Sequence, residues 1–141
     1  MRVPLIVYLP GAVPKHVVVK RSHIDLAPTL MELAGAPLPS DLSLRGTSLV
    51  SDVLAAPNQP LAERDVFIDM PLGPFNEMRR AYITGPSPGT KLIDFGRRYE
   101  VYDLSRDPEE RQNLAGDPAR VAPLVDGMTR FRSQLQEMPA R

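Results

Sequence analysis

The stretch from Tyr99 to Pro118 carries carboxylates at a density that could support metal binding or acid–base catalysis. A calcium loop would need oxygen ligands at alternating positions around a central glycine, and this stretch lacks that spacing. Asp107 and Glu110 are instead spaced as the two ends of a capping box, and a second Asp–Pro pair begins at Asp117. We therefore predict a short helical turn at 107–110, a helix start at Asp117, and carboxylates bonded to backbone amides. The acidic residues concerned are Glu100, Asp103, Asp107, Glu109, Glu110 and Asp117.

The other candidate catalytic groups lie apart from one another in the sequence. His16 belongs to a loop rich in proline and lysine, and His23 stands just before a predicted helix. A histidine can act as a general base or a metal ligand, but no second ligand or nucleophile is spaced to join His23. Ser48 has no base nearby in sequence that could activate it as a nucleophile. Three aspartates near strand ends are expected to be turn or edge charges: Asp69, Asp94 and Asp103.

Composition narrows the class of protein. The 141 residues suffice for one compact domain with a modest core. Lys plus Arg and Asp plus Glu each number 17, so no basic excess exists to neutralise phosphates and we expect no nucleic-acid partner. The absence of cysteine excludes disulfides and thiolate chemistry. The apolar run Val3–Leu9 is far shorter than the ~20 residues of a membrane span, so no membrane partner is expected. Its two apolar faces predict a strand buried on both sides.

Helices and four strands would position these groups. Residues 25–34 predict a helix that begins at the N-cap Asp25 and ends before Gly35; its apolar residues lie almost all round, so burial on more than one side is expected. A short helical piece is predicted around 48–54. Strand signals separated by turns predict an antiparallel meander over 66–70, 79–84, 91–95 and 99–104. A C-terminal helix is predicted after Asp117. Its apolar residues form one stripe along the helix: Val121, Leu124, Val125, Met128, Phe131 and Leu135.

Five segments of the chain are RVPLIVYLPG, SHIDLAPTLMELAG, RGTSL, RRAYITGPSPGTKLI and YEVYDLSRDPEERQNLA. In this order they resemble the C-terminal region of sulfatases, which belong to the alkaline-phosphatase-like hydrolases. The resemblance runs from Arg2 to about Phe131. It implies an α+β chain in which residues 1–60 end the large α/β domain with a strand and a helix. Residues 61–141 would form the C-terminal subdomain, a four-stranded antiparallel sheet with a terminal helix. The neighbours of the doubly buried strand would then lie upstream.

The resemblance also implies where the chemistry lies. Sulfatases hydrolyse sulfate esters with a formylglycine, made in the motif Cys/Ser-x-Pro-x-Arg, and with a divalent cation, usually calcium. Both sites would lie upstream of Arg2, and this chain contains no such motif. We therefore expect no catalytic residue, no metal ligand and no cofactor in this chain, and no activity of the chain alone. Loops of the C-terminal subdomain can border the substrate cleft, so Arg79 and Arg80 are candidates for binding an anionic substrate. Solvent-facing structural roles are the favoured interpretation of both.

Two alternatives stay open. The intact protein could act on phosphate mono- or diesters or phosphonates, because the pocket that discriminates among them would lie upstream. The chain could instead be a stand-alone, non-catalytic interaction module that uses its open sheet. The expected partner is the missing N-terminal sulfatase portion, or a second copy joined through residues 3–9 and the predicted helix at 25–34, since an exposed apolar edge templates strand pairing between chains. The sequence indicates neither the substrate nor the cellular compartment.

Overall fold

The computed structural model describes residues 3–37 and 45–134. The chain divides into two compact units, Met1–Ala62 and Glu63–Arg141. We refer to them as unit 1 and unit 2 and describe each by itself. No helix within the described ranges combines the length and the apolar character that a membrane crossing requires.

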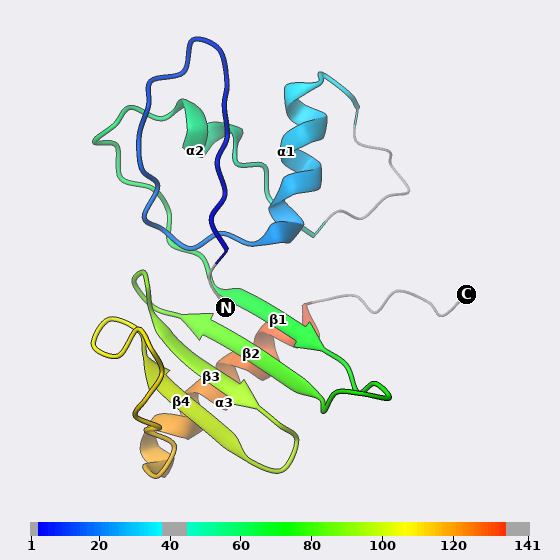
Figure 1. The fold of residues 1–141 in the computed structure, drawn as a ribbon, viewed down its shortest axis with the longest axis vertical. Coiled ribbons are helices and arrows are strands. Elements are labelled where there is room, and N and C mark those ends of the chain that lie inside the picture. The colour runs from blue at the N-terminus through cyan, green and yellow to red at the C-terminus, as the bar shows by residue number, and fades with distance from the viewer. Residues whose placement is uncertain (1–2, 38–44, 135–141) are drawn as a thin grey trace. The chain divides into compact units, whose positions relative to one another are not determined.

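Unit 1 is built from short helices joined by extended chain (Figure 1). A single 3₁₀ turn, η1 (His23–Asp25), runs directly into α1 (Leu26–Leu33), and α2 (Val50–Leu54) follows after a long connection. Gly35 ends α1 with φ +61°, a left-handed conformation that costs glycine little. The two predicted helices are confirmed, and Asp25 is the N-cap residue of α1 as predicted, although its side chain makes no capping hydrogen bond to that helix. Asp25 lies inside the 3₁₀ turn, and its carboxylate accepts the backbone N–H of Ser22 at 3.0 Å.

The predicted burial of the unit 1 apolar residues is not observed. Val3–Leu9 forms no strand, because a strand needs a partner for its N–H and C=O groups and no described residue supplies one. Ile6 is 92% exposed, and on α1 Leu30 is 66% exposed. Only Pro28 and Thr29 of α1 are buried. Unit 1 therefore presents an apolar surface that its own described residues do not cover.

Unit 2 contains a four-stranded antiparallel sheet with strand order β1-β2-β3-β4. The strands are β1 (Val66–Met70), β2 (Arg79–Thr84), β3 (Thr90–Asp94) and β4 (Tyr99–Asp103). The predicted meander is confirmed, with boundaries shifted by one residue at most. In this register, Tyr82 pairs with Phe67 on one side and Leu92 on the other, and Leu92 pairs with Val101. These four apolar side chains therefore form a row on one face of the sheet.

One helix, α3 (Pro118–Ser133), covers that row (Figure 1). Asp117 caps it by accepting the backbone N–H of Ala119 at 3.0 Å, as predicted, and Pro118 occupies the first turn. The helix continues through Pro123, whose ring removes one backbone donor. Met128 is 3% exposed within the core. The predicted stripe of α3 packs against the core through Val121, Leu124, Val125, Met128 and Phe131; Leu135 lies outside the described residues.

The outer edge of β4 is occupied by the connection to α3. The backbone N–H of Val101 donates to the Asn113 side chain at 3.0 Å, and its carbonyl accepts the Leu114 N–H at 2.8 Å. The carbonyl of Asp103 accepts backbone N–H groups of Arg106 and Asp107. The outward-pointing backbone groups of Val101 are thus satisfied by an irregular segment rather than by a further strand.

Phe131→Ala tests whether α3 is docked as described. The ring of Phe131 lies 6.1 Å from that of Phe67 and 6.0 Å from that of Tyr82, between centroids. We expect the free energy of unfolding of unit 2 to fall by about 3 kcal/mol, because truncating a packed aromatic side chain leaves a cavity. Phe75→Ala is the control, since Phe75 is 99% exposed. Denaturant unfolding measures both; equal effects of the two substitutions would contradict the docking.

Candidate functional site

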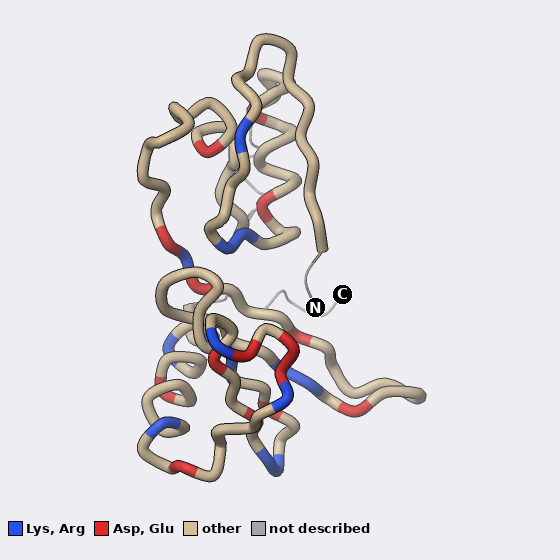
Figure 2. Tube along the Cα trace, turned by 60° about the vertical axis from the view of Figure 1, so that its left-hand side comes forward, with Lys and Arg blue, Asp and Glu red and all other residues tan. Residues whose placement is uncertain are grey.

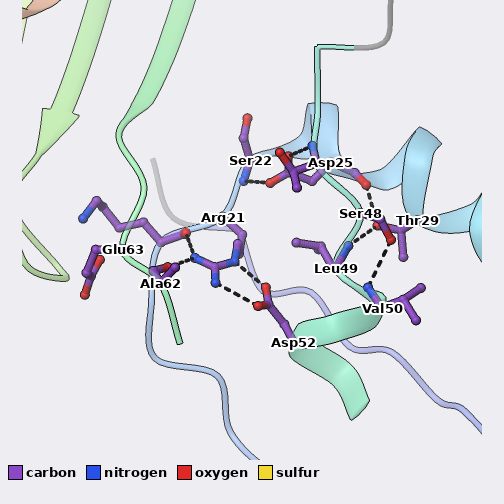
Figure 3. A network of polar contacts seen from close by, with 12 residues as sticks. Arg21, Ser22, Asp25, Thr29, Ser48, Leu49, Val50, Asp52, Ala62 and Glu63 are labelled. Carbon is purple, nitrogen blue, oxygen red and sulfur yellow. Dashed lines mark hydrogen bonds and ion pairs between the residues drawn. The ribbon is translucent and has the colours of Figure 1, made fainter. Parts of the chain in front are cut away.

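The densest polar network of unit 1 is centred on Arg21 (Figure 3). Its guanidinium forms a bidentate ion pair (a fork) with Asp52 of α2. Nε lies 2.5 Å from one carboxylate oxygen and Nη2 lies 3.0 Å from the other. Nη1 donates to the carbonyls of Lys20 at 2.7 Å and Ala62 at 3.1 Å. The side chains of Arg21 and Asp52 are only 10% and 11% exposed. A fork of this kind is geometrically specific and strengthened by charge, so Arg21 joins three separate stretches of chain.

Asp25 and Thr29 extend this network from the start of α1. The Asp25 carboxylate accepts the backbone N–H of Thr47 at 2.8 Å in addition to that of Ser22. The Thr29 hydroxyl donates to the carbonyl of Asp25 and accepts the N–H of Leu49. This brings two chain segments into close contact: a Cβ on Gly46 would lie 1.9 Å from the carbonyl oxygen of Ile24. Only glycine therefore fits at this position.

The unit 1 network has the character of a structural clamp. Its polar side chains are engaged by backbone groups or by each other, and no buried side-chain N or O atom lacks a hydrogen-bond partner in the described part of the chain. His16 and His23 are both exposed, and neither lies in a cluster of metal-ligating groups among the described residues. The hydroxyl of Ser48 accepts the N–H of Val50 at 3.2 Å at the start of α2. In this arrangement the Ser48 hydroxyl bonds to the backbone, and no described base is hydrogen-bonded to it that could activate it as a nucleophile.

Three carboxylates of the stretch 99–118 are bonded to backbone amides. Asp103, Asp107 and Asp117 each accept a backbone N–H, from Ser105, Gln112 and Ala119 respectively. Hydrogen bonds from the backbone of residues 111 and 112 lower the pKa of Asp107. For these three aspartates the predicted backbone role is confirmed.

The predicted helical turn and capping box at 107–110 are wrong. This segment forms an irregular turn, and Glu110 has φ +58°. The reason is an interaction that is distant in sequence: Glu110 turns toward Lys91 of β3, whose Nζ lies 2.7 Å from its carboxylate. The Lys91 side chain is 9% exposed. An ion pair at such a buried position holds the residue in a backbone conformation that a helix would not allow.

The face of the sheet opposite α3 carries a second polar network, in which Lys91 and Tyr102 are buried. Lys91, Glu100 and Tyr102 belong to it by strand alternation. The hydroxyl of Tyr102 donates to Glu100 at 3.0 Å, and Arg98 Nη1 donates to the other oxygen of that carboxylate at 2.7 Å. Burial, followed by the hydrogen bond to Glu100, raises the pKa of Tyr102 to about 12. A phenol held neutral in this way is a hydrogen-bond donor rather than a base at ordinary pH.

The two candidate arginines of β2 differ in their surroundings. Arg80 lies on the α3 face, where its Nε is 3.3 Å from the carboxylate of Asp69. Arg79 lies on the opposite face, with its guanidinium carbon 5.5 Å from the centroid of the Phe95 ring. The third strand-end aspartate considered above, Asp94, accepts the N–H of Gly96 at the β3–β4 turn. The turn and edge roles predicted for these aspartates agree with their contacts.

Several of the residues that organise these networks were not predicted. Arg21, Asp52 and Lys91 are buried ionic groups whose partners stand 31 or 19 positions away in the sequence. Lys91 stands second in the sequence of β3, TKLID, where a charged residue gives no local signal of burial. The structure describes no group of three or more His, Cys, Asp or Glu side chains that could hold a metal ion. The described residues therefore do not fit a calcium site. Figure 2 shows acidic and basic residues interspersed along the trace of both units.

Comparison with known proteins identifies a family. A family model described as N-sulphoglucosamine sulphohydrolase, C-terminal, matches residues 1–138. No curated protein matches the chain at the significance applied. Among solved structures, the chain is similar to BT4656, determined in complex with its substrate D-glucosamine-2-N,6-O-disulfate, with 25% identity and a TM-score of 0.64. It is also similar to BT1596, a 2-O GAG sulfatase, with 26% identity and a TM-score of 0.57.

A third similar structure comes from Bacteroides thetaiotaomicron VPI-5482 and is ascribed to the sulfatases, with 26% identity and a TM-score of 0.57. The matches cover 77% or 78% of this chain but only 23% of each solved chain. This chain therefore spans about a quarter of the length of the proteins that it resembles in structure.

Arg21→Lys should loosen unit 1, because lysine keeps the charge but cannot form the fork with Asp52. We expect the free energy of local opening around α2 to fall by about 2 kcal/mol, less than the cost of removing one partner of a buried ion pair. Hydrogen exchange at the Val53 amide, which donates to Leu49 at 2.9 Å, reports this opening. Arg45→Lys at an exposed position is the control. Unchanged exchange in the Arg21 variant would show that the clamp does not hold α2.

The raised pKa of Tyr102 predicts a loss of stability at high pH. In the unfolded chain the phenol ionises near its ordinary pKa of 10, whereas the folded state retains the proton up to about 12. The stabilisation is therefore complete below pH 10 and is lost as the pH rises through 12. Tyr102→Phe should reduce this loss for unit 2, as measured by denaturant unfolding between pH 9 and pH 12. An identical pH dependence in the variant would contradict the assignment.

Proposed function

The chain belongs to the N-sulphoglucosamine sulphohydrolase C-terminal family, and from this premise we propose that it is the C-terminal part of a sulfatase that hydrolyses sulfated amino sugars. The observation that carries the proposal is the family match over residues 1–138. The similarity to BT4656, whose substrate is a sulfated glucosamine, and to a GAG sulfatase supports this substrate class. A phosphate or phosphonate substrate has no comparable support among these findings.

We propose that the hydrolytic chemistry lies outside this chain. Metal-assisted ester hydrolysis needs a nucleophile and metal ligands in one cleft. The sequence has no cysteine and no Ser-x-Pro-x-Arg motif from which a formylglycine could be made. The described residues also provide no group of three or more acidic, His or Cys side chains suited to a metal. The contribution of this chain is then structural support and contacts to the substrate, and the 141-residue chain alone is inactive.

The exposed apolar surface of unit 1 suggests the partner. Ile6 is 92% exposed, Leu30 is 66% exposed and Leu33 is 41% exposed. Removing apolar area from water is favourable by roughly 25 cal/mol per Å². Covering this surface would therefore stabilise the protein. We propose that the remainder of the sulfatase domain covers it. In a preparation of the chain alone, a second copy takes that place through residues 3–9.

The test begins with the product of the native gene. An antibody against the loop segment 104–116 should detect a polypeptide several times longer than 141 residues. That product, once purified, should release sulfate from D-glucosamine N-sulfate with a higher kcat/KM than it shows for 4-nitrophenyl phosphate. The isolated chain should release neither sulfate nor phosphate. Its mass by light scattering should exceed that of a monomer.

Three results would contradict these proposals. Turnover by the isolated chain would place the catalytic groups within it. A preference for the phosphate ester would favour the other branch of the superfamily. A native product of only 141 residues without activity would favour the stand-alone interaction module.

A further inference from the structure

We propose that Arg79 and Arg98, both exposed and packed over the ring of Phe95, form an anion-binding site at one end of the face of the unit 2 sheet opposite α3. Its ligand is a sulfate group carried by a sugar. The choice of a sugar sulfate rests on the proposed function, whereas the existence of an anion site rests on the geometry alone. The sequence indicated Arg79 and Arg80 as equal candidates, and the structure separates them.

The two guanidinium groups are held by the same ring. The guanidinium carbon of Arg98 lies 4.1 Å from the Phe95 centroid and that of Arg79 lies 5.5 Å from it. A guanidinium packed on a ring can still donate N–H groups to an oxyanion; on Arg98 one of these groups, Nη1, already donates to Glu100 at 2.7 Å. The ring also restricts the rotamers of both arginines. Less conformational entropy is then lost when an anion binds.

Arg79 has positive charge that its surroundings do not neutralise. Within the described part of the chain, no carboxylate lies within ion-pair distance of Arg79, whereas Arg98 pairs with Glu100 at 2.7 Å and Arg80 pairs with Asp69 at 3.3 Å. An incoming sulfate would therefore be bound chiefly by Arg79, with Arg98 as a second donor. Arg80 projects from the other face of β2 and cannot take part.

The connection between β1 and β2 places apolar side chains next to this site in sequence. Leu72 is 78% exposed and Phe75 is 99% exposed. The connection is ordered by Asn76, whose side chain donates to the carbonyl of Pro71 at 2.7 Å and whose backbone pairs with Gly73. Phe75 stands four positions before Arg79 in sequence, so its exposed ring is a candidate apolar surface for the sugar, while Arg79 supplies the donor for the sulfate.

The test is a titration of the full 141-residue chain, followed by NMR, with three ligands. D-Glucosamine N-sulfate should shift the Arg79 side-chain Nε–H resonance and the Phe95 ring resonances in a saturable manner. Inorganic sulfate should bind more weakly at the same resonances, and N-acetylglucosamine should not shift them. Arg79→Gln should weaken the sugar sulfate by about tenfold or more, because it removes a charge-assisted pair of hydrogen bonds.

Arg80→Gln is the matched control, since it removes the same charge from the adjacent residue of the same strand. It should change the affinity by less than about twofold, and both variants should keep the backbone spectrum of the folded chain. Equal weakening by the two substitutions, or no saturable shift, would overturn the site. Equal affinity for inorganic sulfate would overturn the sugar ligand. Sulfate binding through Arg79 combined with an inactive native product would leave the site standing and refute the proposed function.

Discussion

The packing of α3 against one apolar row of the sheet is the interaction on which unit 2 depends. Phe67, Tyr82, Leu92 and Val101 lie side by side because the strands pair in a single uninterrupted register. A small sheet needs such a covered face to be stable by itself. The fit is close: a Cβ added at Gly127 would lie 3.0 Å from the Tyr82 ring. A larger residue at Gly127 would therefore require the Tyr82 ring to shift.

Because α3 uses one face for the core, the other face is available for polar interactions. Lys91, Glu100 and Tyr102 occupy it together with the arginines around Phe95. The same face also buries Val66 and Ala81, so ion pairs, the Phe95 ring and apolar packing act together on it. Unit 1 is organised differently again, since the clamp of Arg21 and Asp52 joins its segments while apolar side chains such as Ile6 lie exposed. Each unit thus relies on a different balance of apolar and polar forces.

The parts of the structure that depend on local sequence could be predicted. Strand-forming runs separated by turn residues located the four strands of the meander, and the Asp117–Pro118 pair located the start of α3, because both signals act within a few residues. The capping box at Asp107 was wrong because Glu110 pairs with Lys91, 19 positions away. The strand at 3–9 was predicted from its apolar pattern, but a pattern supplies no pairing partner. The difference between Arg79 and Arg80 required knowledge of which ring and which carboxylate lie beside them.

The occupied edge of β4 has a consequence for how unit 2 behaves in a crowded solution. Strands at the margins of a sheet can recruit other chains, and natural sheets blunt such margins to avoid aggregation. At Val101 the outward N–H and C=O are already engaged by Asn113 and Leu114, and the Asp103 carbonyl by residues 106 and 107. A foreign chain would first have to displace this segment, which Lys91 also retains through Glu110. Pairing of a strand from another copy with β4 is therefore blocked, and a fibril cannot elongate through this edge of the sheet.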